Sequence, residues 1–344
     1  MRRILIVRLG AMGDILHALP AVTALRAALP ASEIAWVVEP RWVELLRAEN
    51  GSPAQMPVVS RVHLAPARRW SRAPLSSRTF AEIRQLTHAL RQEKYDLTID
   101  LQGAVRSAFI ARLARARTIA GEAVPREPIA RHLFNHQIAT KGVHVVEQAL
   151  EVTSAAVGMP LPMVAPDLPV DPKAEEWRDA IVKGRYAVIN PGAGWGAKRW
   201  PPDRYAEVAR SLAERGYQVF INASIEEREL GNSVVIASCG AAQMVACSIS
   251  ELISLLRRTS LFIGGDTGPL HLAAALQRPC VGIYGPTDPA RNGPFGTPSR
   301  VLRHPESTRD HSRRHETEAG MMTISAVDVI AACDDLLAET AARA

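Results

Sequence analysis

One carboxylate, Asp14, stands where a first buried strand gives way to a helix. The segment RLGAMGDILHALP (8–20) places Gly10 and Gly13 in the turn before it. This spacing fits neither a dinucleotide-binding G-x-G-x-x-G nor a phosphate loop that ends in Gly-Lys-Ser/Thr. A carboxylate in this place could accept a proton from a substrate hydroxyl, and the helix start would keep it ionised. The structural alternative is an N-cap that only satisfies backbone amides.

A second candidate site lies in the segment LFIGGDTGPLHLAAAL (261–276). Its glycine-rich turn precedes Pro269, a residue that suits the first position of a helix. Backbone N–H groups and the helix dipole at such a turn can bind a pyrophosphate, and His271 would contact the same phosphates. A histidine near a helix start is, on its own, more often a structural hydrogen-bonding group, but this context favours the phosphate contact.

Lys198, on the loop NPGAGWGAKRWP (190–201), is a third candidate. The chain has no D-x-D at a strand end, the pair of carboxylates with which a sugar transferase can hold a divalent cation on a diphosphate. Amides, Lys198 and His271 would then supply the positive charge, and we expect neither a metal nor a cofactor. The alternative for Lys198 is a solvated loop lysine. Three further histidines are interpreted as solvated loop residues rather than metal ligands: His304, His311 and His315.

These residues need elements to position them, and short apolar runs predict the strands. The runs occupy residues 4–7, 34–38, 96–100, 186–190, 218–222, 261–265 and 280–284. Apolar runs that alternate with amphipathic stretches indicate parallel sheets with helices on both faces. We therefore expect an α/β protein with two Rossmann-like, doubly wound domains, each with a ligand site at the carboxyl ends of its strands.

A proline-rich segment, MPLPMVAPDLPVDP (159–172), marks the junction between the domains. It has five prolines in fourteen residues and neither a helical nor a strand period, as a semi-rigid linker would. We predict domains at 1–165 and 166–325, followed by a C-terminal helix at 326–344. A length of 344 residues also exceeds what one ordinary core accommodates. The polar segment 304–320 is expected to be an exposed loop.

The net charge of +6 is unevenly distributed. Residues 1–170 carry 21 Lys and Arg against 14 Asp and Glu, whereas the remainder carries 20 against 21. The basic first half predicts an anionic partner, which would be nucleic acid, a phospholipid surface or a phosphorylated substrate; simple arginine enrichment is the alternative. No apolar stretch is long enough for a bilayer, and Arg8 interrupts the first apolar run too early for a signal peptide. The four cysteines have no paired spacing, so we expect a reduced, cytoplasmic protein.

Taken in order, several motifs resemble glycosyltransferase family 9, the ADP-heptose:lipopolysaccharide heptosyltransferases. They cover nearly the whole chain: MGDILHALPAVTALR (12–26), DLQGAVRSA (100–108), REP (126–128), KRWP (198–201), GGDTGPLHLAAAL (264–276) and GPTDP (285–289). The segment ARRWSRAPLSS (67–77), with Gln102, Gly103 and REP, resembles most the members that add the first heptose to the Kdo residues of lipid A.

This resemblance implies a GT-B fold, in which the acceptor binds the first domain, the donor binds the second, and reaction takes place in the cleft between them. It implies inverting, metal-independent transfer from ADP-heptose to Kdo-lipid A, at the inner leaflet of the membrane. Asp14 matches the catalytic base. The donor-side positions are Lys198, Glu227, Asp266, Thr267, Gly268 and His271, and the basic acceptor-side positions are Arg68, Arg69, Arg72 and Arg126.

The resemblance also assigns roles within the donor set. Asp266 matches a carboxylate that contacts the donor heptose, and Lys198 matches a lysine near the phosphates. Thr267, Gly268 and His271 match the phosphate-binding turn. Glu227 matches a ribose-binding acid, with Glu226 and Glu229 close by.

There are departures from the family pattern. Ala193 and Gly194 stand where threonines often precede the lysine, so backbone amides or Trp195 would contact the phosphates there. Cys247 replaces a methionine of the adenine pocket, which implies a looser purine contact. The segment 304–320 has no counterpart.

Two rival interpretations remain open. The enzyme could use another acceptor, such as the site of the second or a later heptose, or another nucleotide sugar, because diphosphate and ribose contacts do not define the sugar. Alternatively, the basic first half could bind nucleic acid or a membrane. Nucleic-acid binding is the weakest of these interpretations, because a single-strand site needs aromatic platforms and only 5% of the residues are aromatic. We therefore expect no nucleic-acid partner.

Overall fold

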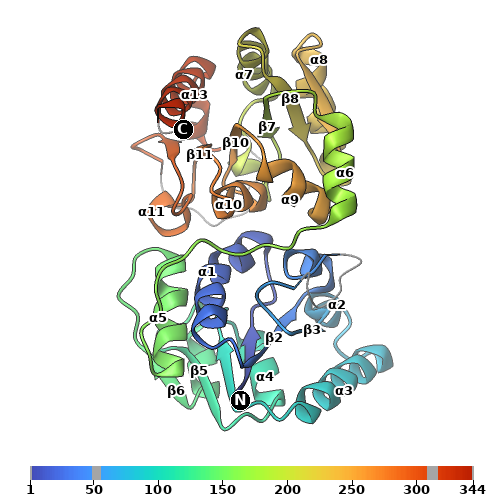
Figure 1. Cartoon of the computed structure of the whole chain (residues 1–344), viewed down its shortest axis with the longest axis vertical. Coiled ribbons are helices and arrows are strands. Elements are labelled where there is room, and N and C mark those ends of the chain that lie inside the picture. The colour runs from blue at the N-terminus through green and yellow to red at the C-terminus, as the bar shows by residue number, and fades with distance from the viewer. Residues whose placement is uncertain (1, 49–55, 308–316, 343–344) are drawn as a thin grey trace. The chain divides into compact units, whose positions relative to one another are not determined.

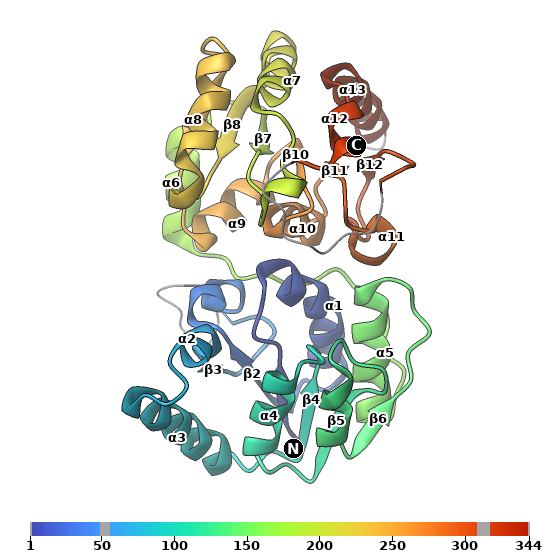
Figure 2. The same cartoon turned by 180° about the vertical axis from the view of Figure 1, so that it is seen from behind.

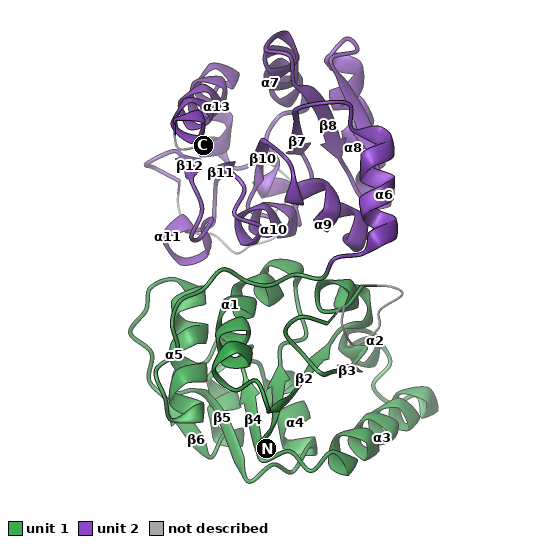
Figure 3. Cartoon of the chain, viewed as in Figure 1, with its two compact units in different colours: residues 1–169 green, residues 170–344 purple. Residues whose placement is uncertain are grey.

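The chain folds into two compact units, residues 1–169 and 170–344 (Figures 1 and 3). The structure, a computed structural model, describes residues 2–48, 56–307 and 317–342. Each unit contains one sheet of six strands, and all neighbouring strands pair in parallel. The α/β fold class with two Rossmann-like, doubly wound units is confirmed.

Unit 1 alternates strands with helices along its length. In chain order it consists of β1 (Arg3–Val7), α1 (Met12–Ala28), β2 (Glu33–Val38), the 3₁₀ helix η1 (Pro40–Leu45), β3 (Arg61–Leu64), α2 (Ala67–Arg72), α3 (Ser77–Gln92), β4 (Leu97–Asp100), α4 (Val105–Leu113), β5 (Thr118–Glu122), η3 (Pro128–Leu133), β6 (His136–Ile138) and α5 (Val145–Val157). Its sheet order is β3-β2-β1-β4-β5-β6, so the direction of strand addition reverses between β1 and β4.

The core of unit 1 follows from the side-chain alternation of its strands. Leu5 and Val7 point to one face and pack with Trp70 of α2 and Leu90 of α3, because successive side chains of a strand point to opposite faces. On the other face α1 lies along α5, and Figure 2 shows the two helices side by side. Helices thus cover both faces, and the loops at the strand ends carry the polar groups.

Unit 2 repeats the same plan. It consists of α6 (Pro172–Ile181), β7 (Tyr186–Asn190), η4 (Gly196–Lys198), α7 (Pro202–Glu214), β8 (Gln218–Asn222), η5 (Ile225–Glu227), α8 (Arg228–Ala237), β9 (Ala242–Val245), α9 (Ile249–Arg257), β10 (Leu261–Gly265), α10 (Gly268–Ala275), β11 (Cys280–Tyr284), α11 (Pro289–Asn292), β12 (Ser299–Arg303), α12 (Ala319–Thr323) and α13 (Ala326–Ala341). Its order, β12-β11-β10-β7-β8-β9, reverses between β7 and β10.

The helix α13 belongs to the core of unit 2. Val329 and Leu336 are completely buried and join a cluster with Ile189 of β7 and Trp200. Ser325 caps the helix by accepting a hydrogen bond from the Asp328 amide at 3.2 Å, and the Asp328 carboxylate accepts from the Ser325 amide. The C-terminal helix is therefore both capped and packed within this unit.

The apolar runs located the central strands and missed five others: β3, β5, β6, β9 and β12. Four of these are outer strands with exposed or half-buried residues, so their sequences show no continuous apolar run. The prediction of an exposed loop at 304–320 is confirmed for residues 305 and 306, which are exposed and outside any helix or strand, and is wrong for Ser307 and for residues 319–320. Ser307 is buried, and α12 begins at Ala319 with Gly320 buried, because these residues fold back onto unit 2. Residues 308–316 of this segment lie outside the described residues.

Candidate functional site

Polar groups gather where the strand order of each sheet reverses. In an open α/β sheet the loops at the carboxyl ends of the two strands flanking such a point diverge, which leaves a crevice where ligands bind. In unit 1 the two loops follow β1 and β4, and in unit 2 they follow β7 and β10. The predicted residues Asp14 and Asp266 lie on these loops or on the helix starts beyond them.

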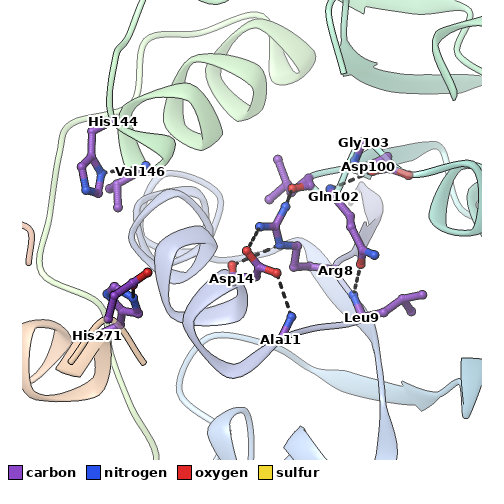
Figure 4. Close-up of polar contacts among 12 residues, drawn as sticks. Arg8, Leu9, Ala11, Asp14, Asp100, Gln102, Gly103, His144, Val146 and His271 are labelled. Carbon is purple, nitrogen blue, oxygen red and sulfur yellow. Dashed lines mark hydrogen bonds and ion pairs between the residues drawn. The ribbon is translucent and has the colours of Figure 1, made fainter. Parts of the chain in front are cut away.

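Asp14 is held in place by two contacts that leave part of its carboxylate open. Oδ2 accepts a hydrogen bond from the Ala11 amide at 2.8 Å, and Oδ1 lies 2.9 Å from Nη2 of Arg8 (Figure 4). The side chain remains 35% exposed. The N-cap residue of α1 is Ala11, and Asp14 sits three positions later, so the N-cap interpretation of Asp14 was wrong in position. The carboxylate is ionically paired and accessible to a proton donor.

Arg8 is a site residue that sequence reasoning missed, because it was interpreted only as the end of an apolar run. Its Nε donates to the backbone carbonyl of Asp14 at 3.1 Å, and its Nη1 donates to the carbonyl of Leu101, after β4. The guanidinium therefore joins the two loops that flank the reversal point. Its place after the first strand, beside an acidic helix start, was the available signal.

The turn after β4 fixes the other side of this arrangement. Gln102 accepts a hydrogen bond from the Leu9 amide through its side-chain oxygen at 2.8 Å, while Oδ1 of Asp100 accepts from the amides of Gln102 and Gly103 at 2.8 and 2.7 Å. Burial raises the pKa of Asp100 to about 6, although the hydrogen bonds from Gly103, Ser107 and Gln102 oppose that rise. Asp100 is 2% exposed, so it supports the turn from beneath and does not face a ligand.

The four basic residues predicted for the acceptor side differ in whether their guanidinium groups form ion pairs. Arg68, Arg72 and Arg126 are exposed and form no ion pair among residues 2–48, 56–307 and 317–342. Arg69 instead pairs with Glu82 of α3 at 2.6 Å. Arg126 lies next to the β4 turn, since the adjacent Glu127 amide donates to the Gly103 carbonyl at 2.8 Å.

In unit 2 the structure brings Lys198, Asp266 and His271 together. Nζ of Lys198 forms an ion pair with Oδ2 of Asp266, and Nε2 of His271 lies 3.0 Å from Oδ1. The side chains of Lys198, Asp266 and His271 are 9%, 8% and 6% exposed. Burial alone would raise the pKa of Asp266, but the hydrogen bond and charge of His271 and the charge of Lys198 outweigh it and lower that pKa. The carboxylate is thus ionised between two basic groups, and Lys198 is not the solvated loop lysine of the alternative interpretation.

The helix α10 begins directly beside this cluster. Thr267 is its N-cap residue, and its hydroxyl donates to the Gly265 carbonyl at 3.3 Å without capping the helix. Gly268 is the first helical residue. The first amides of α10 therefore have no side-chain cap among the described residues, and a helix N-terminus of this kind attracts an anion.

Glu227 lies against the loop after β7. A side chain on Gly192 would meet both carboxylate oxygens of Glu227 at 2.3 Å, so the glycine is needed for this close approach. Glu227 is half-buried, whereas Glu226 and Glu229 are exposed. The geometry thus singles out Glu227 among the three acids as the one beside the loop of Lys198.

Two buried asparagines complete this edge of the sheet, and sequence reasoning missed both. Asn190 ends β7 and Asn222 ends β8. The side-chain amide Nδ2 of Asn222 donates a hydrogen bond to Oδ1 of Asn190 at 2.7 Å. The thiol of Cys247 lies 3.4 Å from the Asn222 side-chain oxygen, and burial raises its pKa to about 12. Asn190 and Asn222 are the last residues of two predicted strands, and this position was the signal that could have identified them.

Metal-ligand clusters and membrane-spanning helices are both absent from the described residues. No three His, Cys, Asp or Glu side chains within residues 2–48, 56–307 and 317–342 converge as metal ligands would. His304 lies in this part of the chain, but His311 and His315 lie outside the described residues. In the same part of the chain, no helix has the length and apolar composition to span a bilayer.

Comparison with known proteins assigns the chain to a family. The model of glycosyltransferase family 9 (heptosyltransferase) matches residues 83–322. Lipopolysaccharide heptosyltransferase 1 of Pseudomonas aeruginosa is 32% identical over 298 residues, which are 86% of this chain and 81% of that protein. The chain belongs to glycosyltransferase family 9. It is therefore a glycosyltransferase of the heptosyltransferase kind.

Further relatives and a solved structure support the same family assignment. Lipopolysaccharide heptosyltransferase 1 of Escherichia coli K12 is 32% identical over 310 residues, 88% of this chain and 94% of that protein. The structure of E. coli heptosyltransferase WaaC with ADP superimposes with a TM-score of 0.81 at 28% identity, and covers 97% of this chain and 99% of that one. Lipopolysaccharide heptosyltransferases 2 and 3 also match, over 64% and 76% of this chain. The family 9 enzyme thus has the GT-B fold class of two Rossmann-like units, and acts in the assembly of the lipopolysaccharide core.

Proposed function

We propose that this enzyme transfers heptose from ADP-heptose to a Kdo residue of Kdo-lipid A, with inversion at the anomeric carbon and without a metal ion. The assignment to the first heptose rests on one observation. The lipopolysaccharide heptosyltransferases 1 align with 86% and 88% of this chain, more than the heptosyltransferases 2 and 3 do. The residues at the two reversal points supply chemistry suited to each half of this reaction.

On the acceptor side, Asp14 acts as the base. The acceptor hydroxyl oxygen attacks the anomeric carbon of the heptose as its proton passes to the carboxylate of Asp14. The bond from the anomeric carbon to the diphosphate oxygen breaks, and its electron pair leaves with ADP. Arg8 orients Asp14 for this step, because its guanidinium contacts both the carboxylate and the backbone carbonyl of that residue.

On the donor side, unit 2 stabilises the leaving diphosphate. Lys198 provides positive charge, and His271 and the backbone amides at the start of α10 provide N–H donors. In a buried setting these groups act more strongly than in water. Asp266 holds Lys198 and His271 in place and contacts the donor heptose. Glu227 binds the ribose.

The proposal extends to the surroundings of the enzyme. Unit 1 contains the acceptor domain and unit 2 the donor domain, with the basic residues Arg68, Arg69, Arg72 and Arg126 facing the carboxylated and phosphorylated acceptor. The protein works in the cytoplasm, in reversible electrostatic contact with the inner leaflet. Nucleic acid is not among its partners.

The test is a transfer assay with ADP-heptose and Kdo-lipid A, run with and without a chelator. Product formed equally in both supports the proposal, and loss of product on chelation contradicts the metal-free mechanism. A matched panel offers an acceptor that already carries the first heptose, and UDP-sugars as donors. Faster transfer to the heptosylated acceptor would support the alternative, a later step of core assembly.

A further inference from the structure

The 3₁₀ helix η1, which follows β2, lies directly against the loop that leads to Asp14. The Glu39 amide donates to the Leu9 carbonyl at 3.1 Å, and the Trp42 amide donates to the Glu39 carbonyl at 3.0 Å. A side chain on Gly10 would come within 2.7 Å of Nε1 of Trp42, and Gly10 has a φ of +147°. The indole of Trp42 therefore occupies the space over a glycine that no other residue would fit.

Arg41 is stacked on this indole. Its guanidinium carbon lies 4.3 Å from the centroid of the Trp42 ring, within the range of a cation–π interaction, which restrains the cation without neutralising it. Arg41 is exposed and forms no ion pair within the described part of the chain. The half-buried Trp42 ring thus restrains a charged group that has no ion-pair partner among the described residues.

Arg68 reaches the same place from α2. Its backbone amide donates to Oε1 of Glu39 at 2.7 Å, which ties the start of α2 to the end of β2. Burial lowers the pKa of Arg41, the charge of Arg68 lowers it further, and Glu39 opposes them. Two guanidinium groups therefore repel each other here, and Glu39, 8% exposed, offsets only part of that repulsion.

We propose that Arg41, held on Trp42 and acting with Arg68, binds an anionic group of the acceptor, a carboxylate or a phosphate. This inference rests on the proposed function, because it concerns the acceptor of that reaction. Guanidinium groups suit this task, since their planar N–H donors match two oxygens of a carboxylate or phosphate. The position beside the Gly10 loop makes Arg41 a binding residue and Trp42 a positioning residue.

The decisive comparison uses Arg41→Gln and the matched control Arg84→Gln, which removes the same charge from an exposed residue of α3. We expect Arg41→Gln to raise the KM for Kdo-lipid A about 10-fold, as the loss of one charge-assisted hydrogen bond does. The KM for ADP-heptose and kcat should change less than about 2-fold, and the acceptor effect should shrink at high salt. Equal acceptor KM values for the two variants would overturn the inference.

Trp42 is tested by rescue and by a double variant. Trp42→Phe keeps an aromatic face and should retain most of the acceptor affinity, whereas Trp42→Leu should lose nearly as much as Arg41→Gln. In the Arg41→Gln background, Trp42→Leu should then add little, because both changes remove one interaction. Additive losses would mean that Trp42 and Arg41 act independently, which contradicts a positioning role for Trp42. Wild-type hydrogen-exchange protection of β1 and β4 verifies that unit 1 of each variant is folded.

Two further experiments are needed. The first distinguishes a carboxylate from a phosphate as the bound group, and the second distinguishes failure of the Arg41 inference from failure of the proposed reaction. The ratio of acceptor KM values between Arg41→Gln and wild type is measured again with Kdo-lipid A that lacks its phosphates. If the ratio persists, the group is the carboxylate; if it disappears, the group is a phosphate. Binding of Kdo-lipid A in mixed micelles to the ADP-loaded enzyme is measured on the same variants. Wild-type affinity in Arg41→Gln overturns the inference, while binding without any transfer overturns the proposed reaction alone.

Discussion

The two reversal points of this chain share one topology and differ in how open they are. At the first, Arg8 and Asp14 are 13% and 35% exposed. At the second, Lys198 and Asp266 are 9% and 8% exposed. A base must meet a hydroxyl that arrives from outside, which the open arrangement allows. The charges of the second point are enclosed, and under the proposed function they would act on a diphosphate at low dielectric.

The difference also concerns what each charge does before a substrate arrives. Arg8 stabilises Asp14 and is itself held by backbone carbonyls. Lys198 is already satisfied by Asp266, so a diphosphate must compete with that carboxylate for the ammonium group. Under the proposed function, the nucleotide would bind by exchange of partners, whereas the acceptor hydroxyl would meet a carboxylate with an open side.

The largest expected effect tests the open site. Asp14→Asn removes the proposed base and keeps the shape, so turnover should fall about 10²- to 10⁴-fold, the usual contribution of a positioned base. Affinity for ADP, measured by calorimetry, should stay at the wild-type value because unit 2 is unchanged. Near wild-type turnover in this variant would remove Asp14 from the mechanism.

The next effect tests Asp100, the buried carboxylate that holds the turn after β4 beside the same site. The folded pKa of Asp100, about 6, exceeds the value of about 3.9 in an unfolded chain. The stabilisation that Asp100 contributes to the folded state is therefore fully present below about pH 4. It is lost as the pH rises through about 6, a change of roughly 3 kcal/mol in the free energy of unfolding.

Asp100→Asn abolishes this titration while an oxygen remains for the amides of Gln102 and Gly103. The variant should become more stable relative to wild type as the pH rises from 4 to 7, measured by hydrogen exchange of β1 and β4. Amides of unit 2 serve as the internal control. A difference between variant and wild type that does not change with pH would refute the raised pKa.

A third effect tests the enclosed site. Lys198→Gln should weaken ADP binding about 10- to 100-fold, because a charge-assisted contact to the diphosphate is lost. Lys183→Gln removes the same charge from an exposed position of unit 2 and serves as the control. If both variants bind ADP with wild-type affinity in calorimetry, Lys198 has no role at the diphosphate.

The smallest effect tests the edge of the open site. Arg68→Gln should raise the KM for the lipid acceptor several-fold, with the increase fading as salt is added. Arg69→Gln should raise it less than about 2-fold, because Glu82 already occupies the Arg69 guanidinium. Steady-state kinetics at two ionic strengths distinguishes them, and a larger effect at Arg69 would reverse this order.

Sequence patterns predicted the parts of the molecule that repeat a local rule. The strands β1, β7 and β10 are buried on both faces and read as apolar runs, and the glycine-rich start of α10 has a characteristic composition. Because the parallel strands of a sheet end at one edge, the strands alone placed Asp14 and Asp266 each at the carboxyl edge of its own sheet.

The parts that escaped prediction depend on contacts between distant segments. Arg8 bonds to Leu101 and Asn222 to Asn190, and neither pairing leaves a periodic trace in the sequence. The partner of Lys198 was missed for the same reason, since Asp266 lies on another loop. Arg41 resembled any surface arginine until Trp42 was seen beneath it.

The contact between Gly192 and Glu227 has a consequence for redesign of the donor site. Any side chain at 192 would force the Glu227 carboxylate, the flexible end of that side chain, away from the loop, so a substitution here removes the close approach of Glu227. Gly194, two residues later, has no atom within 4 Å of where a Cβ would stand. Libraries that seek acceptance of new nucleotide sugars should therefore diversify 194, including threonine, and leave 192 untouched.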